Sequence, residues 1–182
     1  YQTLYGENTE TAATDAANAM NELSQLIDFE EDGSDIQKLN QAAGLDWISL
    51  DSRTISILDK AEKVAQDSGG AFSPTIVPIL NLWGFSGSNP SVPTQEKIEQ
   101  FLPYVDYQNL RVDTQENTAS LKMRYSSVSL DGVYNGSLCE SAVSSYQTSG
   151  VAAGIITVGN SVGVYGTKPD GSKWTLAVKN PD

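Results

Sequence analysis

The spacing of apolar residues changes along the chain, and this change restricts the fold more than any other feature. Before residue 102, apolar residues mostly recur at three- and four-residue spacing, which is typical of helices with one buried face. After residue 108, short segments alternate apolar and polar residues, which is typical of strands. One more helical segment interrupts these strands. Helices followed by strands, with one inserted helix, predict an α+β fold in which helices pack on a mainly antiparallel sheet.

Capping and breaking residues set the expected ends of these elements. Ser34 and Thr94 are placed to cap helices, and we expect Ser52 to cap the clearest helix, which Gly69-Gly70 ends. The expected helices are residues 13–27, 35–43, 53–68, 76–82, 95–105 and 135–149. The expected strands are residues 1–6, 46–50, 109–113, 119–123, 127–130, 151–159, 161–166 and 173–179. A loop is expected at residues 84–93 and a turn at residues 168–171.

Charge and rare residue types exclude several classes of function. With 23 acidic and 11 basic residues, the net charge of −12 opposes binding to a phosphate backbone, so we expect no nucleic-acid partner. The chain has no histidine and a single cysteine, Cys139, which excludes an intramolecular disulfide and any Ser-His-Asp or Cys-His mechanism. A metal site would therefore use oxygen ligands, which suits Mg²⁺ or Ca²⁺. No apolar run approaches membrane-spanning length.

The segment Ser68–Phe85, SGGAFSPTIVPILNLWGF, combines features that are unusual together. Each part has an ordinary interpretation: the double glycine as a helix end, the prolines as helix starts and Trp83 as a core residue. Their order is more specific, because a double glycine, an aromatic residue, Pro-Thr and an apolar helix precede Leu-Trp-Gly-Phe. The segment is therefore either ordinary core structure or the wall of a binding site.

This segment closely resembles the signature Ser-Gly-Gly-Ala-Phe-Asp-Pro-Thr, apolar stretch, Leu-Trp-Gly-Phe of the FAD:protein FMN transferase (ApbE) family. Residues 34–44, SDIQKLNQAAG, are similar to the family segment Ser-Glu-Leu-Ser-Arg-Leu-Asn-x-x-x-Gly. Residues 166–181, GTKPDGSKWTLAVKNP, resemble its Gly-x-x-Pro-Asp-Gly-x-x-Trp-x-Val-x-Ile-x-x-Pro segment. The blocks occur in the family order, so the resemblance spans nearly the whole chain.

The resemblance implies a single, partial ApbE-like FAD-binding domain over residues 1–182. Members of the family bind FAD in a cleft between two lobes and use Mg²⁺ to cleave its pyrophosphate. They transfer FMN to a threonine of a target flavoprotein subunit and release AMP, and some hydrolyse FAD instead. The resemblance also implies an extracytoplasmic location, with a membrane anchor in the full-length precursor.

Matching positions give a candidate site. The residues expected to bind the FAD cofactor are Phe29, Ser34, Asp35, Thr75, Trp83, Asn135 and Glu140, and the backbone carbonyl near Gly132 is expected to complete a metal shell. Structural alternatives remain open for most of them. Ser34 and Asp35 can belong to a helix cap, Phe29 and Trp83 to the core, and Glu140 to a solvated helix face.

Several positions depart from the family pattern. Ser73 replaces the aspartate of Phe-Asp-Pro-Thr, and Ser129 and Asn135 replace the aspartate and lysine of Asp-Leu-Gly-Gly-Ile-Ala-Lys-Gly. The family Gly-Gly-Asp appears as residues 159–161, Gly-Asn-Ser. The segments that hold the family's metal-binding aspartate and threonine have no counterpart in this sequence.

Two explanations of these departures stay open. The chain is either a fragment, completed by a second chain or lobe, or a short relative that has lost catalysis. The activity of this chain alone is in question in either case. The alternatives to an FMN transferase are therefore a non-catalytic flavin-binding relative and a structural or interaction module that no longer binds flavin.

Overall fold

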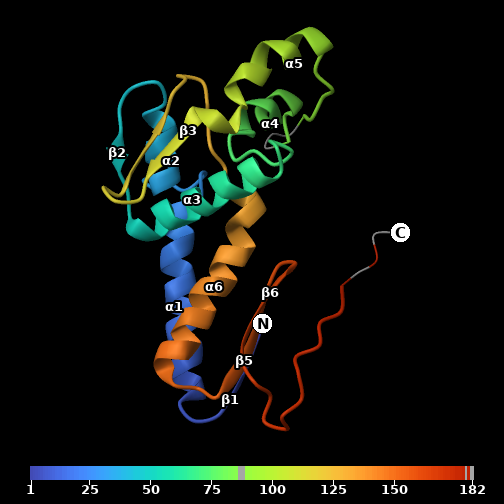
Figure 1. Cartoon of the computed structure of the whole chain (residues 1–182). Helices are drawn as coiled ribbons and strands as arrows, with labels where there is room; N and C mark the ends of the chain where they lie inside the picture. Colours follow the sequence, from blue (N-terminus) through green and yellow to red (C-terminus); the bar gives the residue numbers. More distant parts are fainter. Residues whose placement is uncertain (86–88, 179, 181–182) are drawn as a thin grey trace. The chain divides into compact units, whose positions relative to one another are not determined.

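The computed structural model describes residues 1–85, 89–178 and 180, and these form two compact units (Figure 1). The terminal unit combines Tyr1–Glu22 with Asn135–Asp182, and the central unit is Leu23–Tyr134. Two long helices, α1 (Thr9–Ile27) and α6 (Asp131–Ser149), contribute residues to both units. The predicted α+β class, with helices and antiparallel strands, is confirmed, whereas the single partial domain over residues 1–182 remains a prediction.

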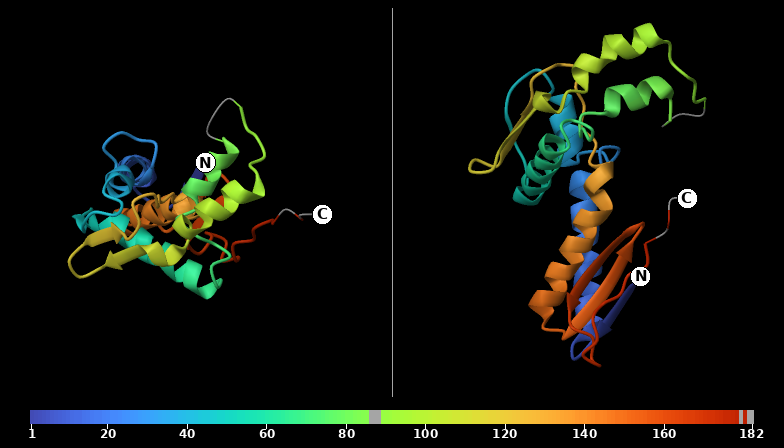
Figure 2. Two further views of the ribbon diagram at one scale, coloured as in Figure 1. Left: turned by 90° about the horizontal axis from the view of Figure 1, so that it is seen from above. Right: turned by 45° about the vertical axis from the view of Figure 1, so that its right-hand side comes forward.

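The central unit packs helices on a small antiparallel sheet with the strand order β2-β4-β3. Its strands are β2 (Ile48–Ser49), β3 (Leu110–Asp113) and β4 (Thr118–Leu121). Its helices are α2 (Asp35–Gln41), α3 (Ser52–Asp67), α4 (Val77–Trp83) and α5 (Gln95–Phe101), with 3₁₀ turns η1 (Leu102–Tyr104) and η2 (Tyr107–Asn109). Figure 2 shows the β3–β4 hairpin beside α3. Apolar side chains of α2, α3 and this hairpin form the buried core: Ile36, Leu39, Ile55, Leu58, Ala61, Leu110 and Leu121.

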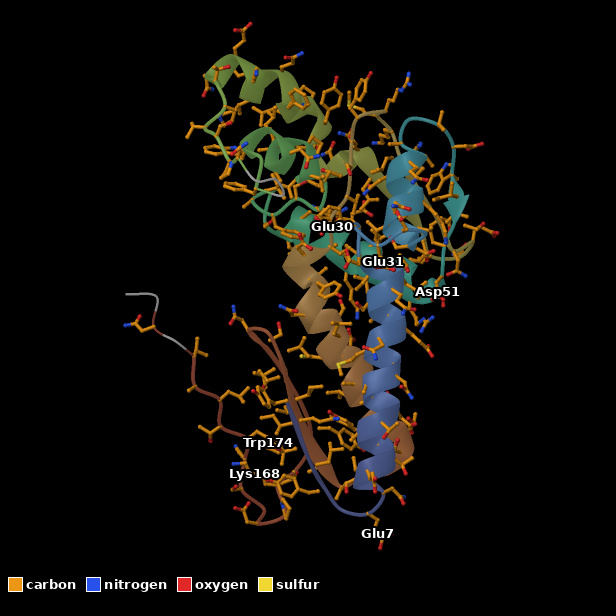
Figure 3. The ribbon with its side chains drawn as sticks, turned by 180° about the vertical axis from the view of Figure 1, so that it is seen from behind. Glu7, Glu30, Glu31, Asp51, Lys168 and Trp174 are labelled. Carbon is orange, nitrogen blue, oxygen red and sulfur yellow. The ribbon has the colours of Figure 1, made fainter. Side chains whose placement is uncertain are left out.

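Side-chain caps start the helices of this unit. Ser34 Oγ accepts a hydrogen bond from the backbone N–H of Gln37, as its position before α2 predicts. Thr94 caps α5 in the same way. The predicted cap of α3 is wrong by one position, because Asp51 is the cap and Ser52 is the first helical residue. Figure 3 labels Asp51. The Asp51 carboxylate accepts from the backbone N–H of Arg53 at 2.8 Å, and the Arg53 guanidinium pairs with the same carboxylate.

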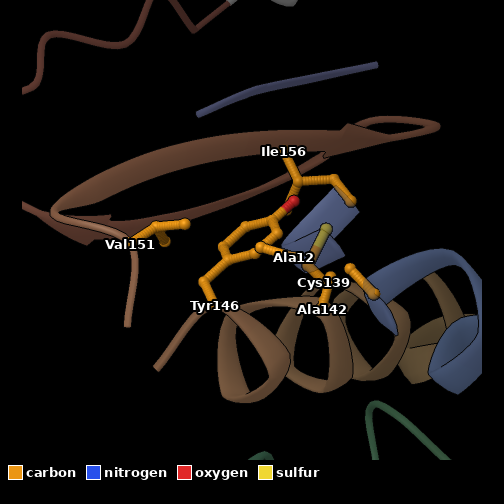
Figure 4. Packing of buried hydrophobic residues seen from close by; sticks show 7 residues of the cluster. Ala12, Cys139, Ala142, Tyr146, Val151 and Ile156 are labelled. Carbon is orange, nitrogen blue, oxygen red and sulfur yellow. The ribbon is translucent and has the colours of Figure 1, made fainter. Parts of the chain in front are cut away.

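The terminal unit packs α1 and α6 against a second antiparallel sheet, in which β1 (Gln2–Tyr5), β5 (Ala153–Val158) and β6 (Ser161–Gly166) lie in the order β1-β5-β6. The two helices run side by side within this unit (Figures 1 and 2). The buried residues of both helices include small side chains, Ala12 and Ala16 on α1 and Cys139 and Ala142 on α6. Figure 4 shows the resulting core, which consists of Ala12, Ala16, Cys139, Ala142, Tyr146, Val151 and Ile156.

Two predicted strands are absent from the part of the chain that the structure describes. Residues 127–130 are extended but pair with no strand, because Val128 bonds through its N–H and C=O to the Asn40 side chain and Ser129 donates to the Pro74 carbonyl. Residues 173–178 also lie outside any sheet, with Val178 92% exposed. Both segments alternate apolar and polar residues, but alternation does not provide a neighbouring strand.

Other differences concern boundaries. Helix α6 begins at Asp131, four residues before the predicted start, and Ser129 Oγ accepts from the Asp131 N–H in the turn that leads into it. Residues 86–88 of the predicted loop lie outside the described residues. No helix in the described part of the chain has the length and apolar character needed to cross a membrane.

Candidate functional site

The central unit contains a pocket of about 380 Å³ with mixed aromatic and acidic walls. Its lining comes from the turn after α1, from α4 and its end, and from the first turn of α6. The lining residues are Asp28, Phe29, Glu30, Leu80, Phe85, Asp131 and Tyr134. Three aromatic rings and a leucine suit a flat, apolar group, and three carboxylates can accept hydrogen bonds from it. The volume lies in the lower part of the range for small-molecule sites.

The turn that holds Phe29 is fixed by local hydrogen bonds. Asp28 Oδ1 accepts from the Glu30 N–H at 2.9 Å, and the Ser34 N–H donates to the Glu31 carbonyl at 3.1 Å. These bonds close the chain between α1 and α2, where Figure 3 labels Glu30 and Glu31. The turn therefore sets the position of Phe29 at the pocket without help from a ligand.

Helix α4 supplies a second wall. Gly84 ends this helix in the left-handed conformation, at φ +67°, which a residue with a side chain adopts only with strain. The turn brings the Phe85 ring parallel to the Trp83 ring, with centroids 5.8 Å apart and 9° between the planes. Phe85 is 64% exposed, so a face of this aromatic pair is open to a ligand.

The first turn of α6 supplies the third wall. The Tyr134 hydroxyl bonds to Ser24 Oγ on α1, which fixes the ring, and Asp131 lies one turn before it. Gly132 sits between them, with the Phe72 ring packed against it. A Cβ atom at Gly132 would lie only 2.6 Å from Phe72 Cε2, so the close contact requires glycine unless Phe72 moves.

The signature segment is tied to the rest of the central unit by two hydroxyls. Ser73 Oγ and Thr75 Oγ1 each donate to the Val105 carbonyl at 2.6 Å and lie 2.9 Å from each other. Thr75 is completely buried. These contacts fix the segment that leads into α4; Thr75 does not line the pocket, and its role in FAD binding remains a prediction.

The ApbE family model matches residues 2–182, nearly the whole chain. The chain belongs to the ApbE family. The FAD:protein FMN transferase of Vibrio cholerae is 22% identical over 176 residues, covering 96% of this chain and 52% of that protein. The Escherichia coli K12 protein of the same name is 23% identical, covering 86% of this chain and 46% of the relative. The chain thus spans about half the length of the curated relatives it matches.

Solved structures of ApbE proteins have the same fold. A variant of the flavin transferase ApbE from Vibrio cholerae superposes with a TM-score of 0.87 at 20% identity, covering 100% of this chain and 63% of that one. The ApbE protein of Thermotoga maritima gives 0.86 at 26% identity, covering 99% and 59%. The predicted family and fold are therefore confirmed.

The pocket of this ApbE protein contains one of the eight predicted site residues, Phe29. Trp83 does not line the pocket but stacks on the lining residue Phe85. Gly132 is next in sequence to the lining residue Asp131. Sequence reasoning missed Asp28, Glu30, Leu80, Phe85, Asp131 and Tyr134 as lining residues. Phe85 and Leu80 lie in the signature segment and Asp131 and Tyr134 in the block around residue 132, so the resemblance marked these regions but not the side chains.

Ser34 and Asp35 are engaged in structural contacts. Asp35 is 4% exposed, and its Oδ2 accepts from the Asp51 N–H at 2.8 Å and the Thr54 hydroxyl at 2.9 Å. Its Oδ1 lies 3.2 Å from Lys38 Nζ. The carboxylate thus ties α2 to the start of α3, and a role of Asp35 in cofactor binding remains a prediction.

The other two predicted FAD-binding residues, Asn135 and Glu140, belong to the terminal unit. The Asn135 amide packs at the β5–β6 turn, where a Cβ atom on Gly159 would meet Asn135 Nδ2 at 2.5 Å. Glu140 is exposed on α6. Their predicted contacts with FAD are untested.

The described residues do not by themselves fit a Mg²⁺ ion. Within residues 1–85, 89–178 and 180, no three Asp, Glu, Cys or His side chains gather as a metal site. Gly132 is a helical residue, so its carbonyl faces along α6 toward the residue 136 N–H. The metal role of Gly132 therefore remains a prediction, with Asp131 as the neighbouring carboxylate.

Proposed function

We propose that this chain binds FAD and that the isoalloxazine ring occupies the pocket lined by Phe29, Phe85 and Tyr134. The observation that carries the proposal is this aromatic pocket in a chain of the ApbE family. The ring system is flat and apolar on both faces, so it gains most from stacking on aromatic side chains. The homologues named FAD:protein FMN transferase support FAD as the ligand.

The acidic side chains of the pocket define the orientation that we propose. Carboxylates accept hydrogen bonds but repel phosphate, so Asp28 and Glu30 suit the flavin N3–H or the ribityl hydroxyls. The pyrophosphate would then lie away from them or be neutralised by a cation. We therefore propose that Mg²⁺ strengthens FAD binding, because it shields the phosphate charge from Asp131 and its neighbours.

We propose that transfer of FMN to a threonine of a flavoprotein subunit is the activity of the longer assembly. A second chain or lobe would supply the metal ligands that the described residues do not gather. The support is that the chain spans about half the length of its relatives. The extracytoplasmic location and the membrane anchor of the precursor are proposals from the family resemblance alone.

Titration of the purified chain with FAD, followed by flavin fluorescence with and without Mg²⁺, tests the proposal. We expect saturable quenching, and we expect Phe29→Ala to weaken affinity by about tenfold through the lost stacking. Tyr125→Ala is the matched control, because Tyr125 is an exposed aromatic residue of the same unit outside the pocket.

Equal weakening by both variants, or no saturable binding, would contradict the flavin site and favour a structural or interaction module. Saturable binding of FAD without release of AMP by this chain alone is the outcome that the proposal expects, because a second chain or lobe would supply the metal ligands. The titration therefore separates the proposed flavin site from a structural or interaction module, and a non-catalytic flavin-binding relative is distinguished by failure to transfer FMN when the longer assembly is complete.

A further inference from the structure

The central unit contains a second pocket, of about 350 Å³, that shares no lining residue with the flavin pocket. Helix α3, the turn η2, strand β3 and the residue after β4 surround it. The lining residues are Glu62, Gln66, Tyr107, Gln108, Leu110, Arg111 and Lys122. Six of the seven are polar or carry a polar tip, so the pocket suits a hydrophilic ligand.

Two cations of this pocket lie on the same face of the β3–β4 ladder. Arg111 is directly opposite Ser120, and the Lys122 N–H donates to the Asn109 carbonyl at 2.9 Å, which continues the ladder. Alternation along each strand then places Arg111 and Lys122 as diagonal neighbours on that face. Two adjacent positive charges repel each other, which a bound anion would relieve.

The positions of the two cations leave them available to a ligand. The Arg111 guanidinium carbon lies 5.0 Å from the centroid of the Trp47 ring, and this stacking orients the guanidinium while its N–H edge remains able to donate. Neither Arg111 nor Lys122 forms an ion pair with any residue that the structure describes. This is notable in a chain with 23 acidic residues.

A buried hydroxyl lies beside these charges. Ser120 is 1% exposed, and within the described structure its Oγ has no hydrogen-bond partner. Its side chain is on the same face of the ladder as that of Arg111. Ser120 is not a lining residue of the pocket, so the proposal rests on Arg111 and Lys122 and not on this hydroxyl.

The opposite wall is polar but includes one carboxylate. Gln66 and Gln108 offer amide groups, and Tyr107, which packs close to Gly70, adds a ring with a phenol tip. Burial raises the pKa of Glu62, the Asp59 charge adds to this, and Lys122 and Lys63 oppose it. A ligand with a hydroxyl at this end would donate to Glu62.

We propose that this pocket binds a small dianion, a phosphate monoester or a dicarboxylate, through Arg111 and Lys122, with a ligand hydroxyl on Glu62. The Arg111 fork suits two oxygens of either anion, and Lys122 adds a point charge. The site is separate from the proposed flavin pocket and does not depend on flavin binding.

Titration of the ¹⁵N-labelled chain with inorganic phosphate and, separately, with succinate at low ionic strength tests this proposal. We expect saturable amide shifts around Arg111 and Lys122, since surface charges are least screened in these conditions. Arg111→Gln and Lys122→Gln should each weaken binding by about tenfold or more. Arg124→Gln and Lys97→Gln make the same charge changes outside the pocket and should leave the affinity unchanged.

Preference for phosphate would identify the ligand as a phosphate ester, and preference for succinate as a dicarboxylate. The proposal would be overturned if neither anion gave saturable shifts up to about 10 mM, where even a millimolar site would be filled. Equal weakening by the control variants would overturn it as well, because binding would then follow net charge. FAD titrations of Arg111→Gln should match those of the unaltered chain, which keeps this test distinct from that of the flavin site.

Discussion

At the scale of single residues, Asp35 shows how one buried carboxylate joins two helices. Asp35→Asn should lower the free energy of unfolding by about 2–3 kcal/mol. The reason is that an amide has one accepting oxygen, whereas the two carboxylate oxygens accept from the Asp51 N–H, the Thr54 hydroxyl and the Lys38 ammonium group. Urea unfolding measures this, with Asp32→Asn as the control that removes the same charge from an exposed turn. Unchanged stability with lost FAD affinity would instead assign Asp35 to the flavin site.

Tyr146 is the residue whose titration should control stability in alkali. Burial is the main cause that raises its pKa from 10.0 to about 12, and its hydroxyl donates to Gln2 Oε1 at 2.7 Å. As the pH rises from about 10 to about 12, the unfolded chain loses this proton while the folded chain retains it, so stability falls. Tyr146→Phe should cost about 1 kcal/mol at neutral pH through the lost hydrogen bond, but remove this part of the alkaline loss.

Urea midpoints of both proteins, measured at neutral pH and across the alkaline range, test this expectation. Other tyrosines and lysines titrate there too, so the informative quantity is the difference between the two proteins. A constant difference at every pH would show that Tyr146 does not carry the effect.

At the scale of elements, helix α6 contains a glycine that its packing requires and another that it does not. Gly132→Ala places a Cβ 2.6 Å from Phe72 Cε2, whereas a Cβ added at Gly136 would meet no atom within 4 Å. Alanine is the better helix former at both positions, so Gly136→Ala should stabilise the protein by about 0.5–1 kcal/mol. Gly132→Ala should destabilise it by about 1 kcal/mol or more, because Phe72 must move.

Thermal unfolding of the two variants checks this contrast, and each serves as the control for the other. Equal stabilisation would show that Phe72 rotates away without cost. Loss of FAD affinity in Gly132→Ala alone would show that the Phe72 contact also shapes the flavin pocket.

The elements also show what sequence reasoning can and cannot supply. Helix periodicity and caps are local, so α1, α2, α3 and α5 were predictable from the sequence alone. Strand pairing is not local, and the alternating residues 127–130 bond to Asn40 and Pro74 and not to a strand. The lining of the pocket was predictable only in part for the same reason. The resemblance indicated Phe29, but only the fold places Asp131 and Tyr134 beside it.

At the scale of the whole molecule, the chain spans about half the length of the transferases it matches, so binding of FAD and its cleavage are tested as separate steps. Cleavage of the FAD pyrophosphate needs charge neutralisation at the phosphoryl group. Asn135 stands where the family resemblance places a lysine, and among the described residues no acidic cluster forms a metal site. We therefore expect this chain to bind FAD but to release no AMP from it when Mg²⁺ is added.

Chromatography of FAD, FMN and AMP after incubation with Mg²⁺ measures this directly, with the full-length Vibrio cholerae FAD:protein FMN transferase as the positive control. Magnesium-dependent AMP formed by this chain alone would contradict the expectation and show that its own residues complete the site. FAD bound but intact would locate flavin recognition in residues 1–182 and leave the metal-dependent step to a second lobe or chain. Binding and catalysis would then be separable along the sequence of an ApbE protein, because the aromatic pocket is built within Leu23–Tyr134.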